Sequence, residues 1–280
     1  MNNRADLHMH TTASDGRNLP SDNVRMAAEI GLGAIAITDH DTVAGIPEAL
    51  EAAKEAGILV VPGVEISTSA EGKDIHILGY GIDYLDERFI ERLLTLRDTR
   101  NSRNEMIVAR LNELGMTITI EEVFAEANRN RRGDGTVGRP HIAQVLVDRG
   151  YVSDLREAFD TYLGEGKAAY VVPPRIQPLK AVEWIHEAGG KAIVAHPGLY
   201  GEDELVASLL DGGADGLEAY HSDHDEAEER KYAKLASDRG KLITGGSDYH
   251  GSREGIVFHG PIGNRTVDLS VAKRLLGSRA

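Results

Sequence analysis

The sequence of 280 residues contains no cysteine. This absence excludes disulfide bonds, thiolate metal sites and a cysteine nucleophile, so a metal site would have to use His, Asp and Glu side chains. Long apolar runs are absent too, because no stretch approaches the roughly 18 residues that a membrane helix needs. The first residues, Met1 to Arg4, carry no apolar signal core. From the sequence we therefore expect a cytoplasmic protein without membrane association.

The chain also lacks an excess of positive charge. It has 31 Lys and Arg residues against 45 Asp and Glu residues, which gives a formal net charge of -14. Proteins that coat nucleic acids are usually basic, so we expect no stable nucleic-acid partner. An acidic chain can still hold a phosphorylated substrate at a local site, because a bound cation dominates the field around it.

Short apolar strands alternate with amphipathic helices at both ends of the sequence. Residues 34–38 form one such strand and residues 191–195 another, each beside a helical stretch. This alternation predicts a mainly parallel sheet with right-handed crossovers. The length fits one α/β barrel, which commonly takes about 250 residues, and such a barrel gathers functional side chains at the carboxyl ends of its strands.

The alternation stops in the middle of the chain, where helical patterns follow one another. We predict one or two helices at 87–114, further helices at 120–127, 140–149 and 153–163, and a polar, glycine-rich loop at 128–138. The predicted organisation is an α/β barrel interrupted by a helical insertion that covers the active site. The barrel would comprise residues 1–86 and 175–280, and the insertion residues 87–174.

Histidine and carboxylate residues recur where the predicted strands end. His8 and His10 are two residues apart, and Asp248 and His250 repeat that spacing. In an extended segment residues i and i+2 point to the same side, so each pair can reach one point. A turn, a helix cap or a loop would explain any one of these residues alone, whereas their common position predicts a metal centre. The candidate ligands are His8, His10, Asp15, His40, Glu65, His76, His196, Asp248 and His250.

Six imidazoles and three carboxylates exceed the donors that one ion can use, since zinc takes about four ligands. The set therefore predicts two or three divalent ions, with Glu65 as the bridging carboxylate. Nitrogen and oxygen donors suit several transition metals. We expect Mn²⁺ first, with Fe²⁺ or Zn²⁺ as alternatives.

Taken together, the motifs resemble the PHP (polymerase and histidinol phosphatase) family of metal-dependent phosphoesterases. The matching segments are H-M-H, S-D-G, T-D-H-D, G-V-E-I, H-I-L-G-Y, A-H-P and G-S-D-Y-H-G, in chain order. The resemblance implies a distorted seven-stranded (β/α) barrel. It also implies three ions, the first held by His8, His10, Glu65 and Asp248, the second by Glu65, His76 and His196, and the third by Asp15, His40 and His250.

The middle of the chain resembles one branch of that family, whose members act on nucleoside 3′,5′-bisphosphates and on short RNA from the 5′ end. The segments are G-R-P-H-I-A from Gly138, G-Y-V from Gly150 and G-K-A-A-Y-V from Gly166. The predicted substrate is thus a nucleotide or a short oligoribonucleotide. Pro140 suits a first helical turn, whose N–H groups can receive a phosphate. Arg139 and Lys167 are the predicted phosphate ligands.

Catalytic roles are predicted for Glu65, Asp248 and His250, together with His224 as a proton donor. His221 lies beside His224, and we expect it to contact substrate; His141, His186 and His259 receive no functional role. The predicted reaction is phosphate-ester hydrolysis by a metal-activated hydroxide. Three alternatives stay open: a histidinol-phosphate-type phosphomonoesterase, an amidohydrolase-like hydrolase and a non-catalytic module that binds RNA ends.

Overall fold

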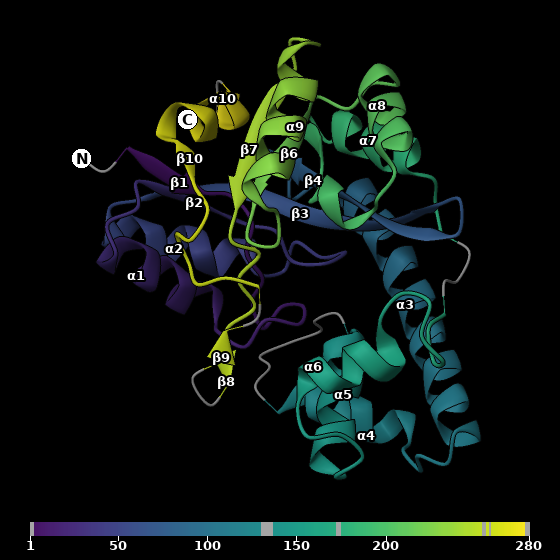
Figure 1. Cartoon of the computed structure of the whole chain (residues 1–280). Helices are drawn as coiled ribbons and strands as arrows, with labels where there is room; N and C mark the ends of the chain where they lie inside the picture. Colours follow the sequence, from purple (N-terminus) through teal and green to yellow (C-terminus); the bar gives the residue numbers. More distant parts are fainter. Residues whose placement is uncertain (1–2, 130–136, 172–174, 254–255, 258, 278–280) are drawn as a thin grey trace.

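An eight-stranded sheet forms the body of the protein (Figure 1). The computed structural model describes residues 3–129, 137–171, 175–253, 256–257 and 259–277. The strand order is β10-β1-β2-β3-β4-β5-β6-β7. The strands are β1 (Arg4–Asp6), β2 (Ala34–Ile37), β3 (Leu59–Ala70), β4 (Lys73–Tyr80), β5 (Lys191–Val194), β6 (Gly216–His221), β7 (Leu242–Gly246) and β10 (Val267–Asp268). A separate hairpin contains β8 (Ser252–Arg253) and β9 (Ile256–Val257).

The sheet closes into a distorted barrel, which confirms the predicted fold. Closure occurs after β1, where the Leu7 N–H donates to the Gly245 carbonyl over 3.1 Å and the Asp248 N–H donates to the His8 carbonyl over 2.9 Å. Strands β1 to β7 match the expected number, whereas the eighth strand, β10, was not predicted because two residues carry no alternation. The sheet is mainly parallel, as expected, with four parallel pairs of strands against three antiparallel pairs. Strand β4 runs antiparallel to both β3 and β5, since a tight turn joins β3 and β4 directly.

Helices cover the barrel, and their ends follow ordinary sequence signals. Helix α2 has a proline in its first turn and ends at Gly57, whose φ of 69° is left-handed, a conformation that glycine adopts without strain. Asp225 caps the N-terminus of helix α9, because its carboxylate accepts from two N–H groups of the first turn. The helices around the barrel are α1 (Pro20–Glu29), α2 (Ile46–Ala56), α7 (Pro178–Glu187), α8 (Asp203–Asp211), α9 (Glu226–Ser237) and α10 (Leu269–Leu276). Helix η2 (Pro197–Leu199) is a short 3₁₀ turn.

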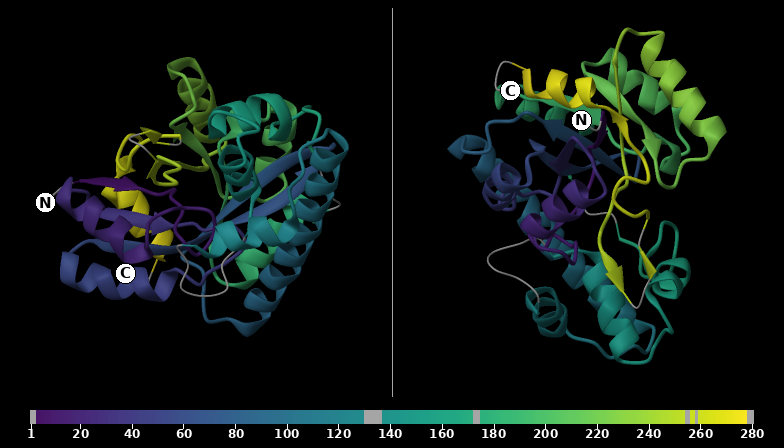
Figure 2. Two further views of the ribbon diagram at one scale, coloured as in Figure 1. Left: turned by 90° about the horizontal axis from the view of Figure 1, so that it is seen from below. Right: turned by 90° about the vertical axis from the view of Figure 1, so that its left-hand side faces the viewer.

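A second group of helices lies below the sheet in Figure 1 and is seen again in both views of Figure 2. It contains the lower half of α3 (Glu87–Glu113), α4 (Ile120–Asn128), α5 (Arg139–Asp148), α6 (Leu155–Ala158) and the π-helical η1 (Phe159–Leu163). Ile107, Leu111, Val123, Ile142 and Leu163 belong to a buried cluster formed by these elements and the segments beside them. Residues 87–113 form one helix instead of two. Of the predicted loop 128–138, residues 130–136 lie outside the described part of the chain.

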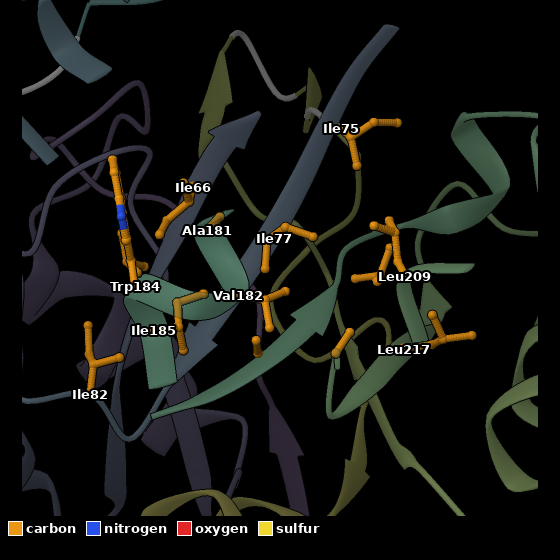
Figure 3. Packing of buried hydrophobic residues seen from close by; sticks show 14 of the residues in the cluster. Ile66, Ile75, Ile77, Ile82, Ala181, Val182, Trp184, Ile185, Leu209 and Leu217 are labelled. Carbon is orange, nitrogen blue, oxygen red and sulfur yellow. The ribbon is translucent and has the colours of Figure 1, made fainter. Parts of the chain in front are cut away.

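Helix α7 packs across β3, β4 and β5 and forms the largest apolar cluster (Figure 3). Val182 and Ile185 of α7 lie over Ile77 of β4, and all three side chains are at least 97% buried. Phe89 and Leu93 place the upper half of α3 in the same cluster. One continuous helix therefore ties the barrel to the lower helices. Within the described residues, no helix is both long enough and apolar enough to cross a membrane.

Candidate metal centre and the pocket beside it

The opening segment after β1 lies inside the mouth of the barrel. His8 and His10 are both fully buried, and their Nε2 atoms are 3.3 Å apart. Asp6 holds this segment, because its carboxylate accepts from the N–H groups of Ser247 and Gly263 over 2.9 and 2.8 Å. The pair therefore converges as the i, i+2 spacing predicts.

Two candidate ligands stand in the middle of strands, and of these only Glu65 was expected just after the end of a strand. Strand β3 continues from Leu59 to Ala70, so Glu65 lies inside it, and His76 lies inside β4. The β3–β4 hairpin is a long ribbon that extends beyond the rest of the sheet (Figure 1), and residues from the middle of its strands lie at the centre of the site. Glu65 Oε1 lies 2.7 Å from His76 Nδ1.

Other candidate ligands follow strands that end at the same rim: His40 follows β2, His196 follows β5 and Asp248 follows β7. His196 and Asp248 have φ angles of 21° and 53°, a left-handed region that L-residues rarely adopt. Strained backbone of this kind persists where the surrounding structure enforces it, and it is frequent at functional sites.

Glu65 sits at the centre of the cluster and presents its two oxygens to different histidines. Oε1 lies 2.7 Å from His76 and 3.0 Å from His196 Nε2. Oε2 faces three other histidines, at 2.9 Å from His40 Nδ1, 3.2 Å from His10 Nε2 and 3.5 Å from His8 Nε2. A carboxylate with this arrangement can bridge two ions.

Asp248 and Asp15 occupy opposite sides of His10. Asp248 Oδ1 lies 3.2 Å from His10 Nε2 and 3.3 Å from His8 Nε2. Asp15 Oδ1 lies 3.3 Å from His250 Nε2, and Asp15 Oδ2 lies 3.7 Å from His40 Nε2. Groups of His and carboxylate donor atoms that lie within 4.8 Å of one another are thus present among these residues, such as His8, His10 and Glu65, or His10, Asp15, His40 and His250.

Several carboxylate oxygens of this cluster lie near histidine nitrogens without forming a hydrogen bond, and these oxygens fit divalent ions. Among the described residues, buried side-chain oxygens without a hydrogen-bond partner include Asp15 Oδ1, Glu65 Oε2 and Asp248 Oδ1. A buried carboxylate oxygen without a hydrogen bond lowers the stability of the fold unless a ligand binds to it. Burial alone would raise the pKa of Glu65, but His40 and His76 hold that pKa well below its usual value. Burial would also raise the pKa values of Asp15 and Asp248, but nearby histidines lower both in the same direction, which favours the ionised form that metal ligands require.

Two buried acids that support the cluster were missed by the sequence analysis. Glu218 in β6 accepts from His8 Nδ1 over 2.9 Å and from the His196 N–H over 3.0 Å. Asp39 accepts from Thr11 and Ser14, which fixes the turn that presents Asp15. Carboxylates in this position orient ligand histidines. The acidic residue inside the apolar strand Gly216–His221 was the available signal for Glu218.

A pocket of about 400 Å³ opens next to the cluster and is lined on its far side by arginines. Arg103 of α3 and Arg139 of α5 both approach Asp74, at 3.3 and 3.5 Å. Arg175 reaches the same carboxylate over 2.9 Å. Three guanidinium groups thus share one carboxylate, and Arg103 Nε is buried without a hydrogen-bond partner. Burial and neighbouring arginines hold the pKa of Arg103 well below its usual value. This region is suited to a bound anion.

The predicted substrate residues are distributed unevenly around this pocket. Arg139 lines it and also lies 5.6 Å from the centre of the Tyr170 ring. Lys167 is exposed and is not among the residues that line the pocket. Pro140 does line the pocket, but the neighbouring Gly138 N–H donates to His141 Nδ1 over 3.1 Å. His141 therefore makes a structural contact at the start of α5.

The two histidines near the end of β6 also differ. His221 is fully buried, and its Nε2 lies 3.3 Å from Asp248 Oδ2, so it belongs to the cluster and not to the pocket wall. His224 uses both ring nitrogens in backbone contacts: Nδ1 donates to the Ala219 carbonyl, and Nε2 accepts from the Gly198 N–H. The structure does not bring His224 to the pocket.

One pocket residue had been given no role. His259 lines the pocket, and its Nε2 lies 3.5 Å from Asp248 Oδ2. Its Nδ1 lies 2.5 Å from Asp223 Oδ2. No sequence pattern indicated this position, because His259 follows the β8–β9 hairpin instead of a barrel strand.

A barrel whose mouth carries a His and carboxylate cluster beside an arginine-lined pocket defines a metal-dependent hydrolase of anionic substrates. Residues 6–163 match the PHP domain. The chain belongs to this family, and it is a phosphoester hydrolase.

Relatives cover nearly the whole chain. The 5′-3′ exoribonuclease Rnm of Escherichia coli K12 is 38% identical over 252 residues, which are 88% of this chain and 84% of that protein. The 3′,5′-nucleoside bisphosphate phosphatase of Chromobacterium violaceum is 35% identical over 255 residues, 89% and 88% of the two chains. A crystal structure from Bifidobacterium adolescentis, assigned as a metal-dependent phosphoesterase, superposes with a TM-score of 0.87 at 30% identity and covers 97% of this chain and 95% of that chain.

Proposed function

We propose that this protein hydrolyses phosphate esters of nucleotides, namely nucleoside 3′,5′-bisphosphates and short 5′-phosphorylated RNA. One observation carries the proposal: the pocket joins the His and carboxylate cluster to the Arg103 and Arg139 side chains. A substrate with one phosphate at each end of a nucleoside would place one phosphate at each wall. The names of the Escherichia coli and Chromobacterium violaceum relatives support both substrate types.

Three ion positions fit the donor sets of the cluster. The proposed ligands are His8, His10, Glu65 and Asp248 for the first ion, Glu65, His76 and His196 for the second, and Asp15, His40 and His250 for the third. The first set contains Glu65 Oε2 and Asp248 Oδ1, two of the carboxylate oxygens without a hydrogen bond, and the third set contains Asp15 Oδ1. Mn²⁺ is the proposed ion, with Fe²⁺ or Zn²⁺ as alternatives. When bound, such ions lower the pKa of water and neutralise phosphoryl oxygens.

The three arginines that approach Asp74, called the arginine wall below, would anchor the phosphate that is not cleaved. A guanidinium group binds phosphate through two parallel hydrogen bonds, and a buried one does so with little competition from water. Asp74 balances only part of the positive charge of Arg103, Arg139 and Arg175, so this wall keeps an excess of two positive charges when three guanidinium groups are set against one carboxylate. Tyr170 and Phe159 lie beside Arg139 and offer apolar surface to the nucleoside.

Product analysis tests the proposal directly. The purified protein, supplied with Mn²⁺, is incubated with adenosine 3′,5′-bisphosphate and separately with a 5′-phosphorylated oligoribonucleotide, and released phosphate and mononucleotide are quantified. We expect phosphate from the first substrate and mononucleotides from the second, with both activities lost in Asp248→Ala and after exhaustive chelation. Full activity in either of those samples, or hydrolysis of neither substrate by the wild type, would refute the proposal.

A further inference from the structure

The pocket contains a histidine outside the nine proposed metal ligands. Five described histidines line the pocket, and four of them, His40, His76, His196 and His250, belong to the ligand sets. The fifth, His259, follows the β8–β9 hairpin, which extends from the barrel toward the lower helices in Figures 1 and 2, and its Nε2 lies 3.5 Å from Asp248 Oδ2.

Asp223 fixes the orientation of this ring. The 2.5 Å contact between Asp223 Oδ2 and His259 Nδ1 places the ring proton of Nδ1 between the two groups, so that Nε2 faces the pocket and Asp248. His259 has a φ of 58°, a strained value for an L-residue. A carboxylate that holds one ring nitrogen while the other faces a reaction site is the arrangement by which enzymes present a histidine for proton transfer.

We propose that His259 donates a proton to the leaving ester oxygen of the substrate, and that Asp223 is its positioning residue. The inference rests on the proposed function, since it requires a phosphate ester in the pocket. In this step the oxygen of water forms a new bond to phosphorus and the ester P–O bond breaks. The ester oxygen leaves with the bonding electrons and takes the proton from His259 Nε2. The proton released by water passes to solvent, from which His259 is protonated again.

Two neighbouring histidines, His224 and His221, are engaged in other contacts and are less suited to donate this proton. Both ring nitrogens of His224 are engaged by the backbone. His221 is fully buried, and its Nδ1 accepts from the Asp223 N–H while its Nε2 faces Asp248. The side chain of His259 is 27% exposed, so a substrate in the pocket can touch it.

The test compares two substrates that differ at one atom. His259→Gln is assayed with adenosine 3′,5′-bisphosphate and with its analogue that carries sulfur in place of the 3′-ester oxygen, because a thiolate leaves without protonation. His186→Gln is the matched control, since His186 is also paired with an aspartate, Asp215 at 2.7 Å, and lies outside the pocket. For His259→Gln we expect a loss of about 10²- to 10⁴-fold on the oxygen ester, the range of general-acid catalysis. On the sulfur analogue we expect the variant to stay close to wild type.

Metal content provides a readout that is independent of turnover. Elemental analysis of His259→Gln should give the same number of ions per chain as wild type, and Asp223→Asn should reproduce the difference between the two substrates. Equal losses on both substrates, or a loss of bound metal, would overturn the inference and make His259 a support for Asp248. Wild-type protein that cleaves neither ester would instead refute the proposed function itself, which separates the two failures.

Discussion

Arg139→Met should remove the advantage that a second phosphate gives to the substrate. Arg139 is the most accessible of the three arginines that contact Asp74, with a side chain that is 21% exposed against 2% for Arg103 and Arg175. Methionine preserves much of the length and apolar contact with Tyr170 while it removes the charge and the hydrogen-bond donors. The barrel and the His and carboxylate cluster do not depend on this side chain.

The expected magnitude follows from the contacts of Arg139. Its Nη1 donates to the Leu163 carbonyl over 3.2 Å and its Nη2 approaches Asp74 at 3.5 Å, so part of the guanidinium edge is available for phosphate. A hydrogen bond to a charged group contributes about 1.5–3 kcal/mol. Loss of one such bond corresponds to a reduction of roughly 10- to 150-fold in kcat/KM, at 1.4 kcal/mol for each factor of ten.

The assay compares adenosine 3′,5′-bisphosphate with adenosine 3′-phosphate, which lacks the anchoring group. Arg139→Met should lower kcat/KM for the bisphosphate only, because the monophosphate never used the arginine. Arg92→Met is the control, since Arg92 also lies over an aromatic ring, that of Trp184 at 5.1 Å, and pairs with Glu187 outside the pocket. If Arg139→Met reduces kcat/KM equally for both substrates, the arginine wall does not anchor the second phosphate.

Three further outcomes follow. Glu65→Gln should lose more than one ion per chain by elemental analysis, whereas Glu71→Gln, in the exposed β3–β4 turn, should lose none. Gly246→Ala should cost about 3 kcal/mol or more in urea unfolding, because its Cβ would lie 2.3 Å from the His8 nitrogen at the barrel closure. Burial would raise the pKa of Asp74, but Arg175, Arg103 and Arg139 lower it to about 2 from 3.8. Asp74→Asn should therefore cost about 2 kcal/mol at neutral pH, and this cost should vanish as the pH falls from about 4 to 2.

The barrel and the cluster were predictable because their signals are local. Each βα unit has its own apolar run and helix. In any extended backbone, residues two apart such as His8 and His10 point to the same side. The reversal of β4 was not predictable from an alternating strand, since alternation does not report direction. The roles of Glu218 and His259 were not predicted for a related reason. Their partners, His8 and Asp223, lie 210 and 36 residues away along the chain.

Strand β4 connects the two halves of the site. Asp74, which gathers the arginines, and His76, which contacts Glu65, are two residues apart in this strand. Alternate residues of a strand face the same side and are separated by about 6.6 Å along it. The distance between the arginine wall and the cluster is thus set by backbone geometry and by the hydrogen bonds of β4 to β3 and β5, not by the loops of the insertion. A substrate that bridges both walls is consequently selected by the separation of its phosphates, and this selection should persist when the bases of the nucleotide are exchanged.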